Sequence, residues 1–282
     1  MKNVSGGLKE WIYPLAFVLC AGWVIWHIPA FLLDYFPHDN PSTLAQVGAL
    51  EETKDVTPNL PGLFGGRTDI IDWIALILMP VTFVLGMRSM VIASMEFEFP
   101  SKLDTFAMFI GRITMILIIS MTMVMLYEVL LRYLFQNPTL WANELTLWIA
   151  GFVFMLSGLY AMQQRSHIRI FILYDVMPRW AQHICDTLWV TLLCTFAFFM
   201  VFGSYKQVFI VKFYRWETFG TAFDPPLPAT IQPMILIIIC MISLQAIANL
   251  IADWNKDPAD LLEKDVIDQE ELEAIKKSVG AS

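Results

Sequence analysis

The amino-acid sequence predicts an all-α integral membrane protein with six transmembrane helices. Of its 282 residues, 57% are hydrophobic and only 16% are charged, whereas about a quarter of the residues in a soluble domain are charged. The apolar residues gather in six runs, each long enough for a helix to cross a bilayer, which takes about 20 residues. The runs cover residues 11–34, 70–93, 104–134, 140–163, 186–210 and 230–252.

The first two runs form an N-terminal extension, residues 1–103. The first run follows Lys2 and Lys9, is too long for the apolar part of a signal peptide and has no clear cleavage site, so we expect an uncleaved span. An acidic loop, residues 37–69, separates it from the second run, which Pro80 interrupts.

The third and fourth runs carry helix-start signals. Ser101 and Asp104 form a variant of the capping box ahead of the third. Asn137 followed by Pro138 predicts an N-cap and a first helical residue for the fourth. Outside the spans we expect a short helix at about 41–52, an amphipathic segment in the interface within 165–182, and a soluble helix in the acidic tail, 256–282.

Charge and cysteine content limit the possible functions. The formal net charge is −8, which argues against nucleic-acid binding and against a polybasic lipid-binding patch. Placement of Lys and Arg favours both termini in the cytoplasm. Cys20, Cys185, Cys194 and Cys240 contain no Cys-x-x-Cys pair, so we interpret them as small buried hydrophobic residues.

Ionisable residues near the ends of the third and fourth spans are the main candidates for a functional site. Glu128 and Arg132 are four residues apart and share a helix face. Glu144 lies one turn into the next span, so Arg132 could pair with either acid. The three residues could relay protons or ions, or they could form an ion pair that orients two helices or contacts a partner subunit. The structural interpretation is favoured, because a relay needs further acids at mid-depth.

Two other polar residues lie inside spans. Arg112, two turns into the third span, can extend its side chain to the interface. His27 lacks a second histidine at matching depth, so we expect a bond to a backbone carbonyl or a neighbour rather than haem ligation. No phosphate loop, zinc motif or nucleophile motif is present. The sequence therefore predicts no enzyme activity and no cofactor.

Residues around the third and fourth spans carry a family resemblance. The pattern resembles the small membrane subunit, DctQ type, of tripartite ATP-independent periplasmic (TRAP) transporters over about residues 104–252. Its matching residues are Arg132, Pro138, Trp141, Glu144, Arg165, His167 and Arg169. The resemblance implies a four-helix membrane domain, residues 104–255, preceded here by two extra spans.

The resemblance also implies a function. Such a subunit does not transport by itself; it braces a large elevator-type permease subunit that carries the substrate and sodium sites. It also helps to dock a periplasmic substrate-binding protein, for ion-coupled uptake of an organic acid across the bacterial inner membrane. A stand-alone membrane channel or carrier is the alternative.

The resemblance assigns roles to two sets of residues. Helix bracing or contact with the large subunit is assigned to Glu128, Arg132, Trp141, Glu144, His167 and Arg169. A docking surface for the periplasmic protein is expected at the turn with Asn137 and Pro138 and at Lys212 and Arg215 in the loop 211–229. The acidic loop 37–69 is a third candidate surface. Membrane lipids are the remaining expected partner.

Overall fold

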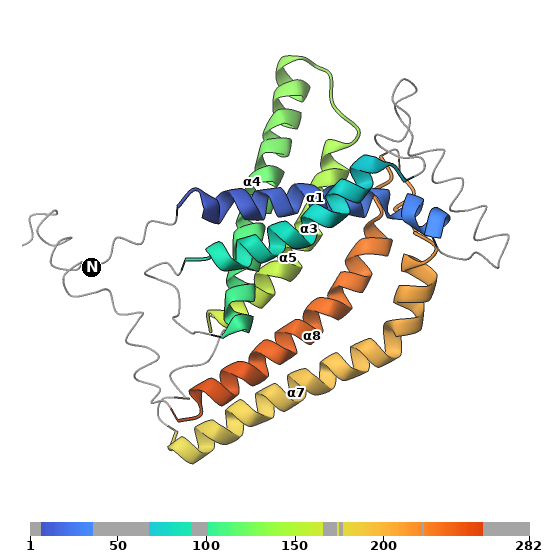
Figure 1. The fold of residues 1–282 in the computed structure, drawn as a ribbon. Coiled ribbons are helices and arrows are strands. Elements are labelled where there is room, and N and C mark those ends of the chain that lie inside the picture. Colours follow the sequence, from blue (N-terminus) through green and yellow to red (C-terminus); the bar gives the residue numbers. More distant parts are fainter. Residues whose placement is uncertain are drawn as a thin grey trace, which may run out of the picture.

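In the described part of the chain, every regular element is a helix. The computed structural model describes residues 7–35, 68–91, 101–165, 174, 177–221 and 223–255. Figure 1 shows α1 (Lys9–Tyr35), α3 (Ile70–Ser89), α4 (Lys102–Leu134), α5 (Ala142–Gln163), α7 (Arg179–Tyr205), the π-helix η1 (Lys206–Phe213) and α8 (Leu227–Asp253). Within these residues, six helical stretches are long and apolar enough to cross a membrane, with α7 and η1 counting as one. The predicted fold class is confirmed.

Several predicted elements lie outside the described residues. These are the short helix at 41–52, the tail 256–282, the loop 37–67 and most of the segment 165–182, including His167 and Arg169.

The helix starts differ from the prediction in two places. Ser101 does cap α4, accepting a hydrogen bond from the amide of Leu103 at 3.2 Å, but Asp104 turns away to Gln245 on α8. A complete capping box lies instead at α3, where Asp69 and Asp72 accept bonds from each other's backbone amides at 3.1 and 3.0 Å. The acidic pair therefore satisfies amides at a helix start that lack partners within the helix.

The predicted N-cap at Asn137 is wrong. Helix α5 begins at Ala142, and Trp141 is its N-cap residue. Gln136, with a left-handed φ of 51°, ends the α4 turn, and the amide of Asn137 bonds back to the carbonyl of Leu131 at 3.1 Å. Asn137 and Pro138 thus belong to the end of α4 and not to the start of α5.

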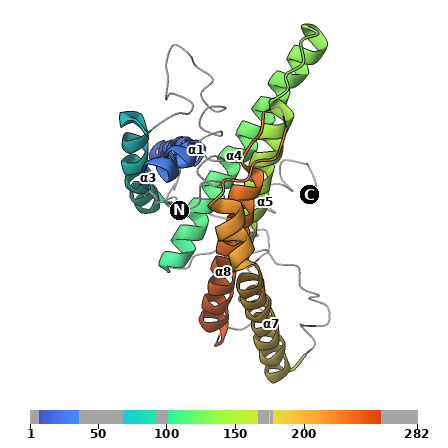
Figure 2. The same ribbon diagram turned by 90° about the vertical axis from the view of Figure 1, so that its right-hand side faces the viewer.

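The last four spans lie side by side in the order α4, α5, α8, α7. Helix α5 packs between α4 and α8, and α7 packs chiefly on α8 at the far side from α4 (Figure 2). The bundle implied by the resemblance is therefore an open row. The main core lies between the first half of α4, α5 and α8, around Phe109, Leu159 and Ile238.

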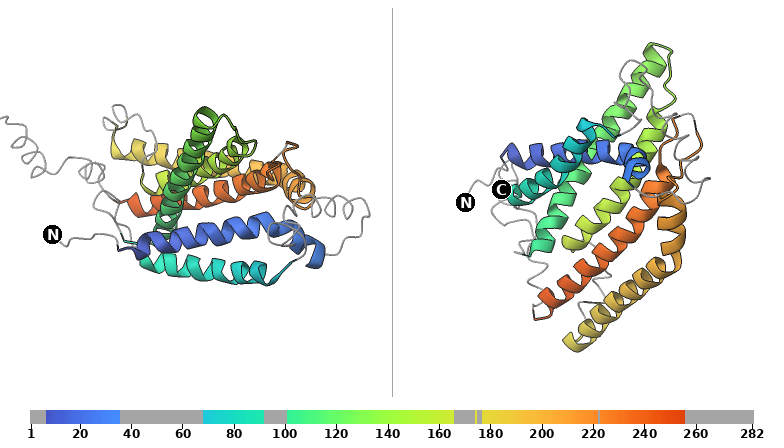
Figure 3. Two further views of the ribbon diagram at one scale, coloured as in Figure 1. Left: turned by 90° about the horizontal axis from the view of Figure 1, so that it is seen from above. Right: turned by 45° about the vertical axis from the view of Figure 1, so that its right-hand side comes forward.

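The N-terminal helices form a hairpin that crosses this row. Helix α1 packs along α3 and runs across α4 and α5, as the views in Figure 3 show. Phe17 of α1 and Phe83 of α3 both meet Phe109 of α4, with ring centroids 5.6 and 5.4 Å apart. Gly86 of α3 makes room for the Phe109 ring, because a Cβ there would lie 2.3 Å from it. The extension is thus joined to the hydrophobic core of the row.

The fifth span is longer than predicted. It runs from Arg179 to Phe213, and its last part is π-helical, with the amide of Tyr214 bonding the carbonyl of Phe209 at 3.0 Å. The following loop therefore begins at residue 214 rather than 211.

The cysteines are free, as expected, but they are less buried than predicted. Cys185 and Cys240 are exposed, and Cys20 and Cys194 are half-buried.

Candidate functional site

Glu128 and Arg132 pair as the helical spacing predicts. The side chain of Glu128 is buried, with 1% of the residue exposed. Arg132 donates to its Oε1 from Nη2 at 2.6 Å and from Nε at 3.1 Å. Oε2 accepts the amide of Thr139 at 3.0 Å and the Thr139 hydroxyl. One carboxylate therefore holds the end of α4 to the turn that leads into α5.

Glu144 has a different partner. Its Oε2 accepts a hydrogen bond from the hydroxyl of Thr221 at 2.6 Å, across 77 residues of sequence. Of the two pairings left open for Arg132, the structure shows the one with Glu128. Trp141 stacks on Tyr127 with centroids 6.1 Å apart, which ties the turn to α4 a second time.

The predicted docking residues lie in two places. Asn137 and Pro138 are exposed in the turn after α4. Lys212 pairs with Glu217, while Arg215 is exposed in the loop that follows η1. Large apolar side chains around the α4–α5 turn are also exposed, namely Tyr133, Leu134, Phe135 and Leu140.

Arg112 is buried, so the prediction that it reaches the interface is wrong. Only 6% of the residue is exposed. Its Nε donates to Glu10 of α1 at 2.8 Å, Nη2 reaches the carbonyl of Val91 at 3.5 Å, and its guanidinium lies 5.8 Å from the Trp11 ring centre. Helix α1 covers the position from which Arg112 would otherwise extend, and it supplies the counter-charge.

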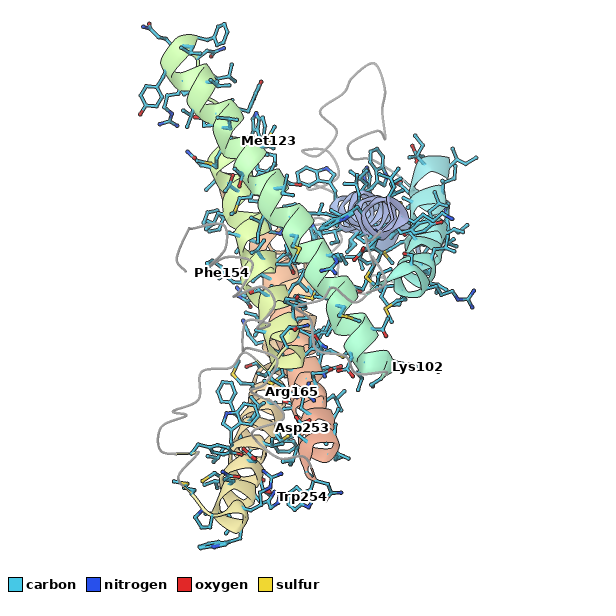
Figure 4. All side chains as sticks on the ribbon, turned by 90° about the vertical axis from the view of Figure 1, so that its left-hand side faces the viewer. Lys102, Met123, Phe154, Arg165, Asp253 and Trp254 are labelled. Carbon is cyan, nitrogen blue, oxygen red and sulfur yellow. The ribbon has the colours of Figure 1, made fainter. Side chains whose placement is uncertain are left out.

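A second polar cluster, which was not predicted from the sequence, joins α4, α5 and α8 at the ends that lie away from the α4–α5 turn. Gln245 of α8 donates to Asp104 of α4 at 2.8 Å and to Asn249 at 3.0 Å, and Asn249 donates to the carbonyl of Met162 at 2.7 Å. Next to it, Arg165 pairs with Asp253 at 2.5 Å. Figure 4 labels Arg165, Asp253 and Trp254 at this end of α5 and α8. A signal for this cluster was present in the sequence, because Gln245 and Asn249 are polar residues four positions apart in an otherwise apolar helix.

His27 bonds to a backbone carbonyl, which is one of the two environments expected from the sequence. Its Nδ1 lies 2.9 Å from the carbonyl oxygen of Trp23 and 3.6 Å from Asp72. Trp23 donates its indole N–H to the same carboxylate at 2.7 Å. Among the described residues, no group of three or more His, Cys, Asp or Glu side chains is arranged to hold a metal ion.

Two of the ion pairs join different helices: Glu10–Arg112 joins α1 to α4, and Arg165–Asp253 joins the end of α5 to α8. The third, Glu128–Arg132, lies within α4, and its carboxylate also binds the following turn at Thr139. Charge in an apolar helix is expensive, so pairing at these junctions is what orienting helices requires. The arrangement positions helices.

A comparison with protein families assigns the second half of the chain. Residues 121–255 match the family model described as tripartite ATP-independent periplasmic transporters, DctQ component. Residues 121–255 are a DctQ component region, preceded by additional helices. No curated protein and no solved structure shows a significant match. DctQ components are not enzymes, and this one is a multi-pass membrane protein of a periplasmic transporter system.

The DctQ match begins inside α4 and covers α5, α7, η1 and α8. Glu128, Arg132, Trp141 and Glu144 fall within it, whereas Arg112 and Asp104 precede it. Helices α1 and α3 are therefore additions to the DctQ region, and the ion pair of Arg112 joins that addition to α4.

Proposed function

We propose that this DctQ component is a scaffold subunit that braces the large permease subunit and does not itself transport. The observation that carries the proposal is the open row of helices α4, α5, α8 and α7, whose ion pairs lie at helix junctions. A carrier binds its substrate near the middle of the bilayer, between broken helices. The described ion pairs of the row instead lie near helix ends: Glu128–Arg132 near the end of α4, and Arg165–Asp253 between the ends of α5 and α8.

The outward sides of the row suit a large apolar partner. Helix α7 exposes aromatic and aliphatic side chains along most of its length, including Trp189, Phe196, Phe199 and Phe202. The second half of α4 exposes a similar stripe through Ile119, Met123, Leu126 and Leu130. Lipid and the permease subunit share these surfaces in the proposal, because both are apolar.

The proposal gives Arg132 and Glu144 an assembly role. Arg132→Gln removes the ion pair with Glu128, whose other carboxylate oxygen binds the α4–α5 turn at Thr139. Glu144→Gln weakens the contact with Thr221. Each is expected to reduce co-purification with the permease subunit more than it alters substrate preference. Altered selectivity with intact co-purification would contradict the assignment. Tyr205→Phe, exposed on α7, is a control for general surface change.

Transport by the isolated chain is the decisive test of the scaffold role. Purified protein in liposomes is expected to take up no organic acid under a sodium gradient, while the full three-component system does. Uptake by the chain alone would show a stand-alone channel or carrier instead.

Docking of the substrate-binding protein is proposed at the α4–α5 turn and the loop after η1. Both present exposed residues of mixed character, Pro138 and Arg215 among them. The inner-membrane location with both termini in the cytoplasm is testable at Cys185, exposed near the start of α7. A membrane-impermeant maleimide should label it in inverted vesicles and not in intact spheroplasts.

A further inference from the structure

The described part of the loop between η1 and α8, residues 214–221 and 223–226, contains strained backbone. Trp216, with a left-handed φ of 48°, is 1% exposed. A bulky residue in this conformation is an outlier and persists only where its surroundings fix it. Asp224 also has a left-handed φ, of 54°.

Part of what fixes this loop comes from outside the DctQ region. Trp216 packs in a cluster with Leu32 of α1 and Ala229 of α8, which Ile25 and Ile28 extend. Ile25, Ile28 and Leu32 follow the i, i+3, i+7 spacing of one helix face. Trp23 and His27, about half a turn away, face α3 instead. Helix α1 therefore lies between α3 and the loop.

A second contact from α1 reaches the other side of the loop. Trp26 stacks on Phe223 with centroids 5.7 Å apart and an interplanar angle of 26°, and it also meets Trp148 of α5 at 6.3 Å. Trp148 in turn donates its indole N–H to Thr230 of α8 at 2.8 Å. Trp26 thus connects the loop to the row of helices.

The far end of α1 is anchored independently. Glu10 forms the buried ion pair with Arg112, and Phe17 packs on Phe109. Because the first turns of α1 are fixed to α4, the rigid helix also fixes the position of Trp26 near its other end. In Figures 1 and 3, α1 passes across the row of helices.

We propose that α1 is an intrachain brace that holds the η1–α8 loop in shape for docking of the substrate-binding component, with Trp26 as its positioning residue. The docking part rests on the proposed function. Arg215 and Phe219 are exposed on this loop while Trp216 is buried beneath it. Helix α1, added ahead of the DctQ region, therefore supports a surface that the region presents.

The first test measures the loop itself in the full chain in nanodiscs. The amides of Trp216, Glu217 and Phe219 bond the carbonyls of Phe213, Lys212 and Pro225, so their hydrogen exchange reports loop opening. Trp26→Ala is expected to speed their exchange by about five- to tenfold, since aromatic pairs add to the stability of burial alone. Trp26→Phe keeps a ring and should stay near wild type, as should Leu19→Ala, which is exposed on the same helix.

Phe223→Ala removes the same contact from the loop side and leaves α1 intact, so it serves if Trp26→Ala does not fold. Unchanged exchange in both alanine variants would overturn the proposal at its first step.

The second test measures docking in proteoliposomes with the complete transporter. Trp26→Ala is expected to raise the half-saturating concentration of the substrate-binding component about fivefold and to leave the maximal uptake rate unchanged, with rescue by Trp26→Phe. A lower maximal rate at an unchanged half-saturating concentration would indicate a merely structural role and overturn the proposal. Faster loop exchange with unchanged docking would overturn the docking step alone, and the scaffold role would stand, since liposome transport by the isolated chain tests it separately.

Discussion

The buried ion pair between Glu10 and Arg112 gives the sharpest prediction about the extension. The side chains are 6% and 7% exposed, and Nε of Arg112 lies 2.8 Å from Oε1 of Glu10. Removing one partner of such a pair leaves a buried charge without its counter-charge, which costs about 3–5 kcal/mol. Glu10→Gln should therefore weaken the attachment of α1 to α4 by that amount.

The expected signal is a local one. A change of about 1.4 kcal/mol is tenfold in an equilibrium constant, so the opening constant of the first half of α1 should rise by about 100-fold or more. Hydrogen exchange of the α1 amides of Tyr13, Leu15, Ala16 and Phe17 measures it in nanodiscs. The amides in the middle of α7 should change little, because α7 packs on α8 away from α1.

The double variant separates loss of charge balance from loss of contact. Glu10→Met with Arg112→Met removes both charges and keeps apolar volume, and such replacements are often neutral. It should exchange within about tenfold of wild type, more slowly than Glu10→Gln alone. The control is Glu217→Gln, whose pair with Lys212 is 40% exposed on the acid side and so contributes about 0–1 kcal/mol. Exchange in Glu10→Gln within about threefold of wild type would refute the reasoning.

Three further predictions concern helix contacts, each measured as thermal stability in detergent. Gly111→Ala places a Cβ 2.5 Å from the Tyr160 ring and should destabilise the α4–α5 contact by about 1–3 kcal/mol. The control Gly22→Ala, with nothing within 4 Å of its Cβ, should be neutral or stabilise the protein by up to about 1 kcal/mol. Equal effects of the two substitutions would contradict the packing argument. Glu128→Gln should cost about 1–3 kcal/mol, because Arg132 and Thr139 lose a charged acceptor; a smaller loss than that of Glu144→Gln would contradict this. Trp148→Phe and Thr230→Val remove the two ends of one hydrogen bond, so each should cost about 0.5–1.5 kcal/mol and the double variant less than their sum; additivity would argue against the bond.

The length of the apolar runs made the six spans predictable. The exact ends of the helices were less predictable, because they depend on contacts between helices. A run of about 20 apolar residues has few alternatives to a membrane helix, so all six spans were placed to within a few residues at most ends. The largest error is at the start of the fifth span, which was placed at 186, whereas α7 starts at Arg179 among polar residues. At its other end, η1 continues through Lys206 and Lys212 to Phe213. A π-helical segment has no sequence signature of its own.

The polar residues could be paired from sequence only where the partner is a near neighbour in the same helix. Glu128 and Arg132 were predictable, because their partner is one helical turn away. Asp104 was assigned to a local capping box, but Gln245, 141 residues later, supplies its bond. The same holds for Arg112, whose partner is 102 residues away. Each of these pairings depends on which helices meet, and one sequence does not state that.

The extension is part of the molecule's core, although the family match begins after it. Residues Ala107 to Thr114 of α4 are buried on every face, and such complete burial of a helix requires neighbours all around it. Helices α5 and α8 cover one side, through the contacts of Gly111 and Asp104. Helices α1 and α3 cover the other, through Phe17, Phe83 and the Glu10 ion pair. The start of α4, which precedes the DctQ match, is therefore the junction between the added hairpin and the DctQ region. For the proposed scaffold role, the hairpin leaves open the outer stripe of α4 and the aromatic face of α7 as surfaces for the permease subunit.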